Sequence, residues 1–401
     1  MNLAKKIVHP VIRAWLRCTA YFFFEKVIVT GKQNIPEDGP VILASNHPNS
    51  FLDGLLLTCY YKRPIYYLAR GDVFSSPFVS ALLHAINIVP IYRREEGAEH
   101  FPKNEETFEF CIETFEDNGT ILIFSEGQSE NEWDLRPLRK GTARLSYSAW
   151  SNEGISSSLK ILPTTITYSS WLKINDVVHL SFLDVIQKKD FPEGVEQAVL
   201  LRKFNETLKT KLENDCVILG KKENQKVQQT IAGFLLKNFP NGKEMAIKAL
   251  SNYNNGNSDE KGKHIDFAHY LKANDIRYFK RANLPLFMVS IAVYDLAFLL
   301  NIIPFSICEY ITKRTTNYNE FYDSVLFCML LFLYPTYLLA ILFIAYFGAH
   351  SILLGVSIIA LILITAKLRE WAKKNMQGYI KRKYFKPLSA MIDELFGKGS
   401  D

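Results

Sequence analysis

The sequence predicts an α/β protein in which a mixed sheet is flanked by helices, with an N-terminal amphipathic helix and a C-terminal helical membrane region. Three observations support this prediction. Between residues 26 and 190, short apolar runs alternate with longer stretches of helical periodicity, a pattern typical of strands and helices packed in layers. The N-terminal residues repeat apolar side chains on one helical face, and the C-terminal third contains long apolar runs.

The N-terminal helix has the character of a membrane-interface helix. Val8, Trp15 and Phe22 recur every seven residues, whereas Lys6 and Arg13 fall on the opposite face. An apolar stripe opposite a basic face allows a helix to lie in the plane of a membrane surface. An ordinary helix packed on the following domain fits the pattern equally well.

Seven apolar runs are expected to be strands, and they cover residues 27–29, 41–43, 65–68, 88–91, 120–124, 162–168 and 177–182. Helical patterns lie between them or follow them, at residues 51–61, 77–85, 104–117, 142–150, 204–213 and 226–236. Strands that alternate with helices in this way predict a largely buried sheet.

The C-terminal third contains three apolar segments. Leu284–Ile307 is almost entirely apolar but is interrupted by Asp295 and Pro304. Val325–Phe347 has 23 residues without a charge, and Ser351–Ala366 has 16. At 1.5 Å per residue the second segment is long enough to cross a bilayer, and the third is marginal.

Basic residues flank this block on both sides, which favours an even number of crossings because Lys and Arg concentrate on the cytoplasmic side. Three spans would give an odd number. Either the first segment is re-entrant or interfacial, or the last two are not both full spans.

These patterns divide the chain into five parts: an amphipathic membrane-interface helix (1–25), an α/β domain (26–190), a helical extension (191–250), a polar linker (251–263), and a membrane region with two or three apolar helices and a basic tail (264–401).

Composition indicates which classes of partner, such as nucleic acids and metal ions, the sequence gives no reason to expect. The net charge is only +6 with a pI near 8.8, which gives no reason to expect a nucleic-acid partner. The six cysteines show no close pairs and no metal-ligand spacing, as in reduced thiols of an intracellular protein. We expect no metal site.

The most informative motif follows the apolar run 41–43, where His47 and Asp53 are separated by five residues. A histidine can take a proton from a hydroxyl near neutral pH, and a carboxylate on its other nitrogen fixes the tautomer. In one continuous helix these residues would face different sides, so the pair requires a strand-to-helix turn. The alternative is a helix-capping box that begins at Ser50, in which Asp53 merely reaches back to the cap.

Other polar residues follow strand ends. Arg93 comes directly after the run 88–91, and Glu126 and Gly127 follow the run 120–124. A guanidinium suits bidentate binding of phosphate, and glycine lets the backbone approach a ligand closely. A solvated surface arginine is the competing interpretation of Arg93.

Arg139 and Lys140 lie in a basic run that precedes the helical pattern at 142–150. The start of a helix preceded by cations is suited to holding a phosphate. A basic surface loop explains the same residues without a ligand.

Taken in order, four blocks resemble the glycerolipid acyltransferase family. They are Asn46-His47 with Asp53, residues 87–93, Phe124-Ser125-Glu126-Gly127, and Ile161-Leu162-Pro163. The resemblance covers roughly residues 25–190 and implies an acyltransferase α/β domain. It implies that His47 is the general base, held by Asp53, and that Arg93, Glu126, Gly127, Arg139 and Lys140 bind the substrate.

The sequence departs from the commonest family pattern at three points. Five residues instead of four separate His47 from Asp53, Asn87 replaces a glycine, and Ser125 replaces a proline. The extra residue and the run 128–141 are similar to the branch that acylates glycerol 3-phosphate or dihydroxyacetone phosphate.

The expected function is therefore transfer of a fatty acyl group from acyl-CoA or acyl-carrier protein to a hydroxyl of glycerol 3-phosphate or dihydroxyacetone phosphate, in phospholipid and phosphatidic acid biosynthesis. The alternative acceptor is 1-acylglycerol 3-phosphate, and a further alternative is an inactive lipid-binding membrane protein. No cofactor is expected beyond the acyl donor. The expected location is the membrane, with integral C-terminal helices and the catalytic domain on the cytoplasmic face.

Overall fold

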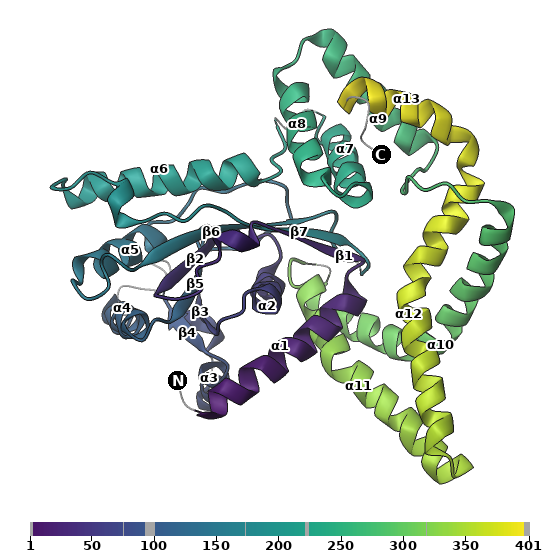
Figure 1. Ribbon diagram of the computed structural model, residues 1–401, viewed down its shortest axis with the longest axis horizontal. Helices are drawn as coiled ribbons and strands as arrows, with labels where there is room; N and C mark the ends of the chain where they lie inside the picture. Colours follow the sequence, from purple (N-terminus) through teal and green to yellow (C-terminus); the bar gives the residue numbers. More distant parts are fainter. Residues whose placement is uncertain are drawn as a thin grey trace. The chain divides into compact units, whose positions relative to one another are not determined.

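The computed structural model describes residues 3–74, 76–92, 101–172, 174–220, 224–317 and 319–396. Within these residues the chain forms a seven-stranded sheet in the order β1-β7-β6-β2-β5-β3-β4 (Figure 1). The strands are β1 (Lys26–Thr30), β2 (Val41–Ser45), β3 (Ile65–Arg70), β4 (Ile88–Ile91), β5 (Thr120–Phe124), β6 (Lys160–Tyr168) and β7 (Val177–Phe182). Each coincides with one of the apolar runs, which confirms the predicted strands.

The sheet is mixed, as predicted. Strand β2 lies between β5 and β6 and runs parallel to both, and β3 runs parallel to β4 and β5. Strand β7 returns beside β6 in the opposite direction: the Ser169 N–H bonds the Val177 carbonyl, and the Leu183 N–H bonds the Pro163 carbonyl. All five residues of β2 are buried, because a central strand covered on both faces carries apolar side chains on both.

Thirteen α-helices lie within the described residues. They are α1 (Leu3–Phe23), α2 (Ser50–Tyr60), α3 (Pro77–Ala85), α4 (Phe101–Glu116), α5 (Gly141–Ser151), α6 (Gln197–Asp215), α7 (Gln225–Asn238), α8 (Gly242–Asn255), α9 (Ser258–Ala273), α10 (Leu284–Thr316), α11 (Tyr322–Ala349), α12 (Ile352–Ile380) and α13 (Phe385–Phe396).

The polar linker predicted at 251–263 is helical instead. Helix α8 continues to Asn255 and α9 begins at Ser258, so that only Gly256 and Asn257 separate them. The Asn257 side chain accepts the Glu260 N–H at 2.9 Å, an N-cap contact that starts α9. The polar composition here marks two helix ends and not an extended linker.

The compact units of the chain cut across the predicted domain boundaries. One unit contains Met1–Arg13, Val29–Thr167 and His179–Cys216, and the other contains Ala14–Ile28, Tyr168–Val178 and Val217–Asp401. Helix α6 belongs to the first unit, where the Phe204 ring packs 5.7 Å from the Trp150 ring of α5. The second unit is assembled from three separate segments of sequence.

The second unit contains the apolar helices. Within the described part of the chain, α10, α11 and α12 are long and apolar enough to cross a membrane, at 33, 28 and 29 residues. Their apolar side chains remain exposed to an extent that water does not favour: Leu299, Ile344 and Leu353 are 68, 67 and 77 % exposed. Exposed apolar area on this scale indicates contact with lipid.

Alkaline carbonate washing of membranes is expected to leave the full-length chain in the pellet. The alkaline wash breaks the electrostatic contacts that hold peripheral proteins on a membrane. Apolar helices inserted in the bilayer keep a protein in place after those contacts are lost. A peripheral protein of the same membranes, released by the same wash, is the control. Release of this chain into the supernatant would contradict the membrane assignment.

Candidate active site

His47 and Asp53 meet at the carboxyl end of β2. The strand ends at Ser45, four residues form a turn, and α2 begins at Ser50. The His47 Nδ1 lies 2.9 Å from Asp53 Oδ2, where the carboxylate is fully buried and the imidazole is 16 % exposed. The turn changes the direction of the chain, so two residues that one helix would hold apart come into contact.

Asp53 also holds the start of the helix. Its Oδ2 accepts the backbone N–H of Asn49, the N-cap residue of α2, at 2.8 Å. The first turn of a helix leaves N–H groups without intrahelical partners and favours a carboxylate. Asp53 therefore reaches back to the helix start and orients His47 with the same oxygen atom. The N-cap is Asn49, however, and not Ser50 as the capping-box interpretation expected.

The His47 ring is also held by stacking on an aromatic ring. It stacks on the Phe124 ring with the centroids 3.7 Å apart and the planes 8° from parallel. With Nδ1–H donated to Asp53, the lone pair resides on Nε2, and none of the described residues hydrogen-bonds that atom. The tautomer follows from this hydrogen-bond pattern. An imidazole in this state is ready to accept a proton at Nε2.

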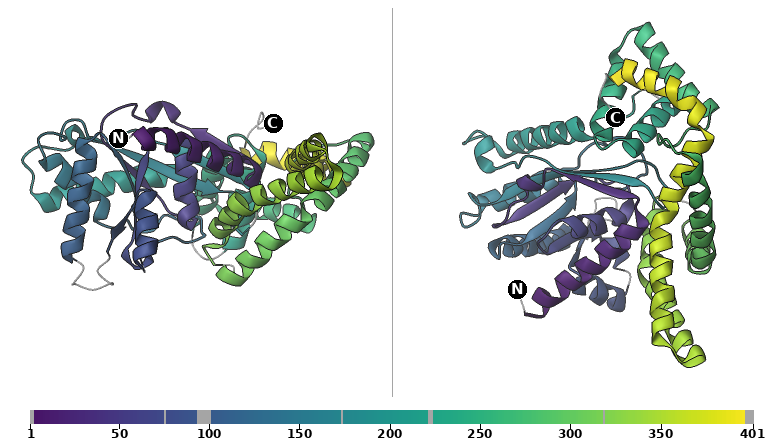
Figure 2. Two further views of the ribbon diagram at one scale, coloured as in Figure 1. Left: turned by 90° about the horizontal axis from the view of Figure 1, so that it is seen from below. Right: turned by 45° about the vertical axis from the view of Figure 1, so that its right-hand side comes forward.

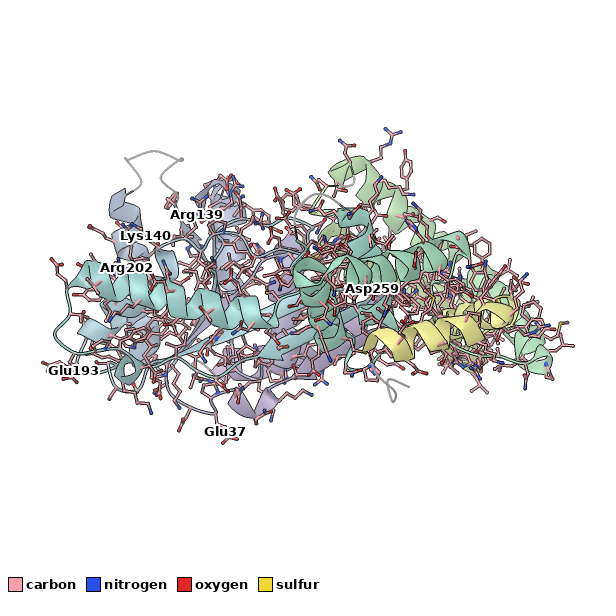
Figure 3. All side chains as sticks on the ribbon, turned by 90° about the horizontal axis from the view of Figure 1, so that it is seen from above. Glu37, Arg139, Lys140, Glu193, Arg202 and Asp259 are labelled. Atoms are coloured by element: carbon pink, nitrogen blue, oxygen red, sulfur yellow. The ribbon has the colours of Figure 1, made fainter. Side chains whose placement is uncertain are left out.

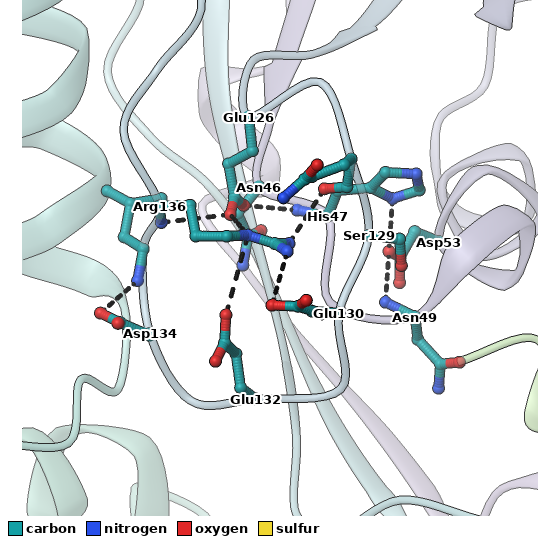
Figure 4. A network of polar contacts seen from close by, with 12 residues as sticks. Asn46, His47, Asn49, Asp53, Glu126, Ser129, Glu130, Glu132, Asp134 and Arg136 are labelled. Atoms are coloured by element: carbon teal, nitrogen blue, oxygen red, sulfur yellow. Dashed lines mark hydrogen bonds and ion pairs between the residues drawn. The ribbon is translucent and has the colours of Figure 1, made fainter. Parts of the chain in front are cut away.

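Glu126 connects the two halves of the site (Figure 4). Its carboxylate is 3 % exposed, and Oε1 accepts the backbone N–H of His47 at 2.8 Å. Oε2 accepts the backbone N–H of Arg136 at 3.2 Å and its Nε–H at 3.0 Å. Both oxygens are thus engaged by the protein itself, which identifies Glu126 as a residue that positions the histidine turn.

Arg136 is surrounded by acceptors. Besides Glu126, its guanidinium contacts Glu130 at 3.0 Å and Glu132 at 3.7 Å, and it donates to the Gln128 carbonyl at 2.9 Å. Burial, and then the neighbouring Glu130 carboxyl, raise the pKa of Glu132. Arg136 thus forms ion pairs with three carboxylates and fixes the loop that follows β5.

Two further contacts attach this loop to the histidine turn. The Ser129 hydroxyl accepts the Ser50 N–H at 2.6 Å, and the Asn131 amide donates to the Pro48 carbonyl at 2.9 Å. Ser50 has a positive φ of 47°, an uncommon conformation for a residue other than glycine. The loop contacts on both sides hold the backbone in this shape.

Gly127 and Arg139 lie side by side. Gly127 has a φ of +73°, and a Cβ atom there would come within 3.0 Å of the Arg139 Cγ, so the position requires glycine. The Arg139 N–H bonds the Ser125 carbonyl at 2.7 Å. Arg139 and Lys140 are exposed just before α5 (Figure 3), where both side chains are accessible to a ligand. Arg93 lies outside the described residues.

The serine that replaces the family's proline has a structural role. Ser125 is buried, its N–H donates to the Ser45 carbonyl at 3.0 Å, and its hydroxyl lies 3.0 Å from the Thr142 hydroxyl. Proline has no N–H and could make neither contact. The substitution therefore joins the ends of β2 and β5.

Sequence reasoning missed Arg136 and Asn46. Asn46 holds the turn to β6 through a pair of contacts: its Nδ2 donates to the Ile166 carbonyl at 3.0 Å, and its Oδ1 accepts the Ile166 N–H at 2.8 Å. The signal for Arg136 was present, since a cation ten residues after Glu126 can fold back on it. Nothing local in the sequence indicates the pairing of Asn46 with β6.

Comparisons with known proteins find one family model and several similar enzymes. Residues 26–167 match the Acyltransferase family model. A 1-acyl-sn-glycerol-3-phosphate acyltransferase of Borreliella burgdorferi is 25 % identical over 175 residues, or 44 % of this chain and 64 % of the relative. A chloroplastic enzyme of the same name from Brassica napus is 25 % identical over 34 % of this chain and 38 % of the relative. Another from Chlamydomonas reinhardtii is 23 % identical over 39 % and 43 %.

The match therefore spans less than two thirds of the length of each of these relatives. Among solved structures, that of the 1-acyl-sn-glycerophosphate acyltransferase of Thermotoga maritima aligns with 53 % of this chain and 81 % of that chain, at 20 % identity and a TM-score of 0.39. The matched segment 26–167 contains β1 to β5, most of β6, and both members of the His47–Asp53 pair. The part of the chain that resembles the Acyltransferase family thus includes the candidate site.

Proposed function

We propose that this protein is a membrane-bound glycerolipid O-acyltransferase that transfers a fatty acyl group from a thioester to a hydroxyl of a phosphorylated glycerol. The observation that carries the proposal is the His47–Asp53 pair, 2.9 Å apart, in a turn held by Glu126 within the family domain. The donor is acyl-CoA or acyl-carrier protein. The reaction uses no metal and no further cofactor.

The chemistry follows from the free nitrogen of His47. Nε2 takes the proton of the acceptor hydroxyl as its oxygen attacks the thioester carbonyl, and Asp53 stabilises the imidazolium that forms. The tetrahedral intermediate then collapses with loss of the thiolate, which receives the proton from His47. One ester bond forms, one thioester bond breaks, and the proton ends on the thiol.

The acceptor that we propose is 1-acylglycerol 3-phosphate, with phosphatidic acid as the product. The motif spacing favours glycerol 3-phosphate or dihydroxyacetone phosphate, but the relatives to which this chain is similar are named 1-acyl-sn-glycerol-3-phosphate acyltransferases. The comparisons therefore favour the alternative acceptor.

The test is an acceptor competition. Purified full-length protein in lipid, supplied with labelled acyl-CoA, is offered 1-acylglycerol 3-phosphate, glycerol 3-phosphate and dihydroxyacetone phosphate in turn. We expect the highest kcat/KM with 1-acylglycerol 3-phosphate. Higher kcat/KM with glycerol 3-phosphate would restore the original expectation, and absence of transfer to every acceptor from either donor would support an inactive lipid-binding protein.

Replacement of Arg93 with alanine is expected to raise the acceptor KM roughly 10- to 150-fold with little change in kcat. The family resemblance gives Arg93 the acceptor phosphate, and a charge-assisted contact of this kind contributes about 1.5–3 kcal/mol. Initial rates against acceptor concentration measure the effect.

Arg202 provides a matched control, because it is an exposed arginine (labelled in Figure 3) whose nearest carboxylate, Glu206, lies 3.8 Å away on the same helix. Arg202→Ala should leave KM unchanged. An unchanged KM in Arg93→Ala, with an increase in Arg139→Ala or Lys140→Ala, would move the phosphate to the exposed pair before α5.

A further inference from the structure

Helix α10 runs along the most highly charged part of α12. Phe287 stacks on Tyr379 with the centroids 4.7 Å apart, and further along α10 the Arg369 guanidinium lies 5.6 Å from the Tyr294 ring and 6.0 Å from the Phe305 ring. As residue numbers rise on α10 they fall on α12, so the two helices are antiparallel. At the same rise per residue on both helices, the first half of α10, about residues 287–297, therefore lies level with residues 369–379.

This pairing prevents α10 from crossing a bilayer. The part of α12 from residue 367 to 374 carries Lys367, Arg369, Glu370, Lys373 and Lys374. A span formed by the first half of α10 would draw these charges into the hydrocarbon, where each unpaired charge is strongly unfavourable. The hydropathy of α10 alone does not reveal this cost.

The exposed face of α10 fits an interface instead. Met288 and Leu299 are 58 and 68 % exposed, and Asp295, also exposed, lies on the helical face between them. A carboxylate in the middle of an apolar face is costly in hydrocarbon but can reach water when the helix lies in the headgroup layer.

Helices α11 and α12 form an antiparallel hairpin joined by His350 and Ser351 (Figures 1 and 2). The base of the hairpin is fixed by residues of α1: Trp15 contacts Phe332 at 5.5 Å between ring centroids, and the Lys367 ammonium donates to the Tyr21 carbonyl at 2.6 Å. Trp and Lys at one level are typical anchors at a membrane interface.

The part of the hairpin beyond this base is too short for two full spans. It comprises about 17 residues of α11 after Phe332 and about 15 residues of α12 before Lys367, or roughly 22–25 Å at 1.5 Å per residue. The hydrocarbon core is about 30 Å thick. The outward-facing side chains of the hairpin are apolar and exposed, including Phe343 at 62 % and Leu353 at 77 %.

We infer that the C-terminal region is a one-sided membrane anchor: the α11–α12 hairpin enters the bilayer and turns back inside it at His350, α10 lies along the interface, and the chain does not cross. The exposed apolar side chains of α10, α11 and α12 contact the lipid of one membrane face. The arrangement accounts for the basic residues on both flanks, because both ends of the region stay on one side. The inference rests on membrane association and is independent of acyl transfer.

Cysteine labelling of the full-length chain with a membrane-impermeant maleimide tests the inference. The background is Cys18→Ser, since Cys18 is exposed whereas the other cysteines are buried or half-buried. Three exposed positions report on other parts of the chain. Glu193→Cys reports on the first compact unit, Arg314→Cys on the end of α10, and Lys383→Cys on the basic tail. His350→Cys and Leu353→Cys report the tip of the hairpin.

Each variant is labelled in right-side-out and in inside-out membrane vesicles, and again after detergent. We expect the Glu193, Arg314 and Lys383 variants to react in the same vesicle type, and both tip variants to react only after detergent. Reaction of a tip variant from the face opposite Glu193→Cys would show two crossings, and reaction from the same face would show that the tip is outside the bilayer. Reaction of Arg314→Cys or Lys383→Cys from the opposite face would show that α10 or the whole region crosses. Each of these three outcomes overturns the inference, while acyl transfer stays a separate readout.

Discussion

Replacement of His47 with alanine is expected to abolish measurable acyl transfer while the protein remains folded and membrane-bound. The variant loses the proposed proton acceptor, and general-base catalysis typically contributes about 10²–10⁴-fold. The ring stacks on Phe124 and bonds Asp53, so its removal should lower the unfolding temperature somewhat, but the loss of rate should be far larger. Initial rates with labelled acyl-CoA, together with thermal unfolding, measure both effects.

Asp53→Asn should lose nearly as much activity as His47→Ala. The amide keeps the size of the buried side chain but removes the charge, and its N–H group can bond Nδ1 and place the ring proton on Nε2, where it blocks the base. In serine proteases the corresponding change costs about 10⁴-fold. His269→Ala, an exposed histidine of α9, is the control that should retain full activity. Near-normal transfer in His47→Ala would remove the proposed mechanism.

Glu126→Gln is expected to lower kcat by about 10²-fold with a smaller change in acceptor KM. The substitution removes a buried charge that accepts three N–H groups from His47 and Arg136, and hydrogen bonds to charged groups are worth about 1.5–3 kcal/mol each. The turn that aims His47 should loosen, so the loss appears in the chemical step. Thermal unfolding should also shift downward, because a buried ion pair is broken.

Two companion variants make this result specific. Glu130→Gln alters another carboxylate on Arg136 but one that is 58 % exposed, and it should retain most activity. Arg136→Lys keeps the charge but not the fork of donors, so it should reproduce much of the kcat loss of Glu126→Gln. A large rise in acceptor KM with unchanged kcat in Glu126→Gln would show instead that Glu126 binds the acceptor directly.

The strands of this fold were predictable because each is a short apolar run with polar flanks. The run 120–124 became β5 without a shift of boundary, and β7 coincides with the run 177–182. The linker at 251–263 was not predictable from composition, because asparagine, glycine and serine mark helix ends as often as loops. The separation of α8 from α9 by two residues depends on the packing of both helices.

The active-site pair was predictable from the local sequence, but its support was not. His47 and Asp53 are six residues apart, so a single turn decides their contact. Glu126 reaches the His47 backbone from 79 residues away, and Asn46 reaches Ile166 from 120 residues away. Contacts at such separation follow from strand order, and no local pattern encodes the neighbours of β2.

Hydropathy found the apolar helices and could not assign their depth. It treats α10 and α11 alike, because both are long enough and apolar enough to cross a membrane. Depth depends on the neighbouring helix, and α10 pairs with the cations of α12 whereas the second half of α11 pairs with the uncharged half of α12. The conflict over an odd number of crossings therefore required tertiary structure for its explanation.

The contact between Lys367 and Tyr21 has a consequence for biosynthesis. It joins positions 346 residues apart, so the unit that contains it cannot be completed until residue 367 has left the ribosome. Until then the aromatic end of α1 lacks its final partners, and closing so long a loop slows the last folding step. Nascent chains are thus expected to depend on a holding chaperone or on early membrane contact at the N-terminus. A frameshift before codon 367 would leave the amino-terminal helix without these contacts although its own codons are intact.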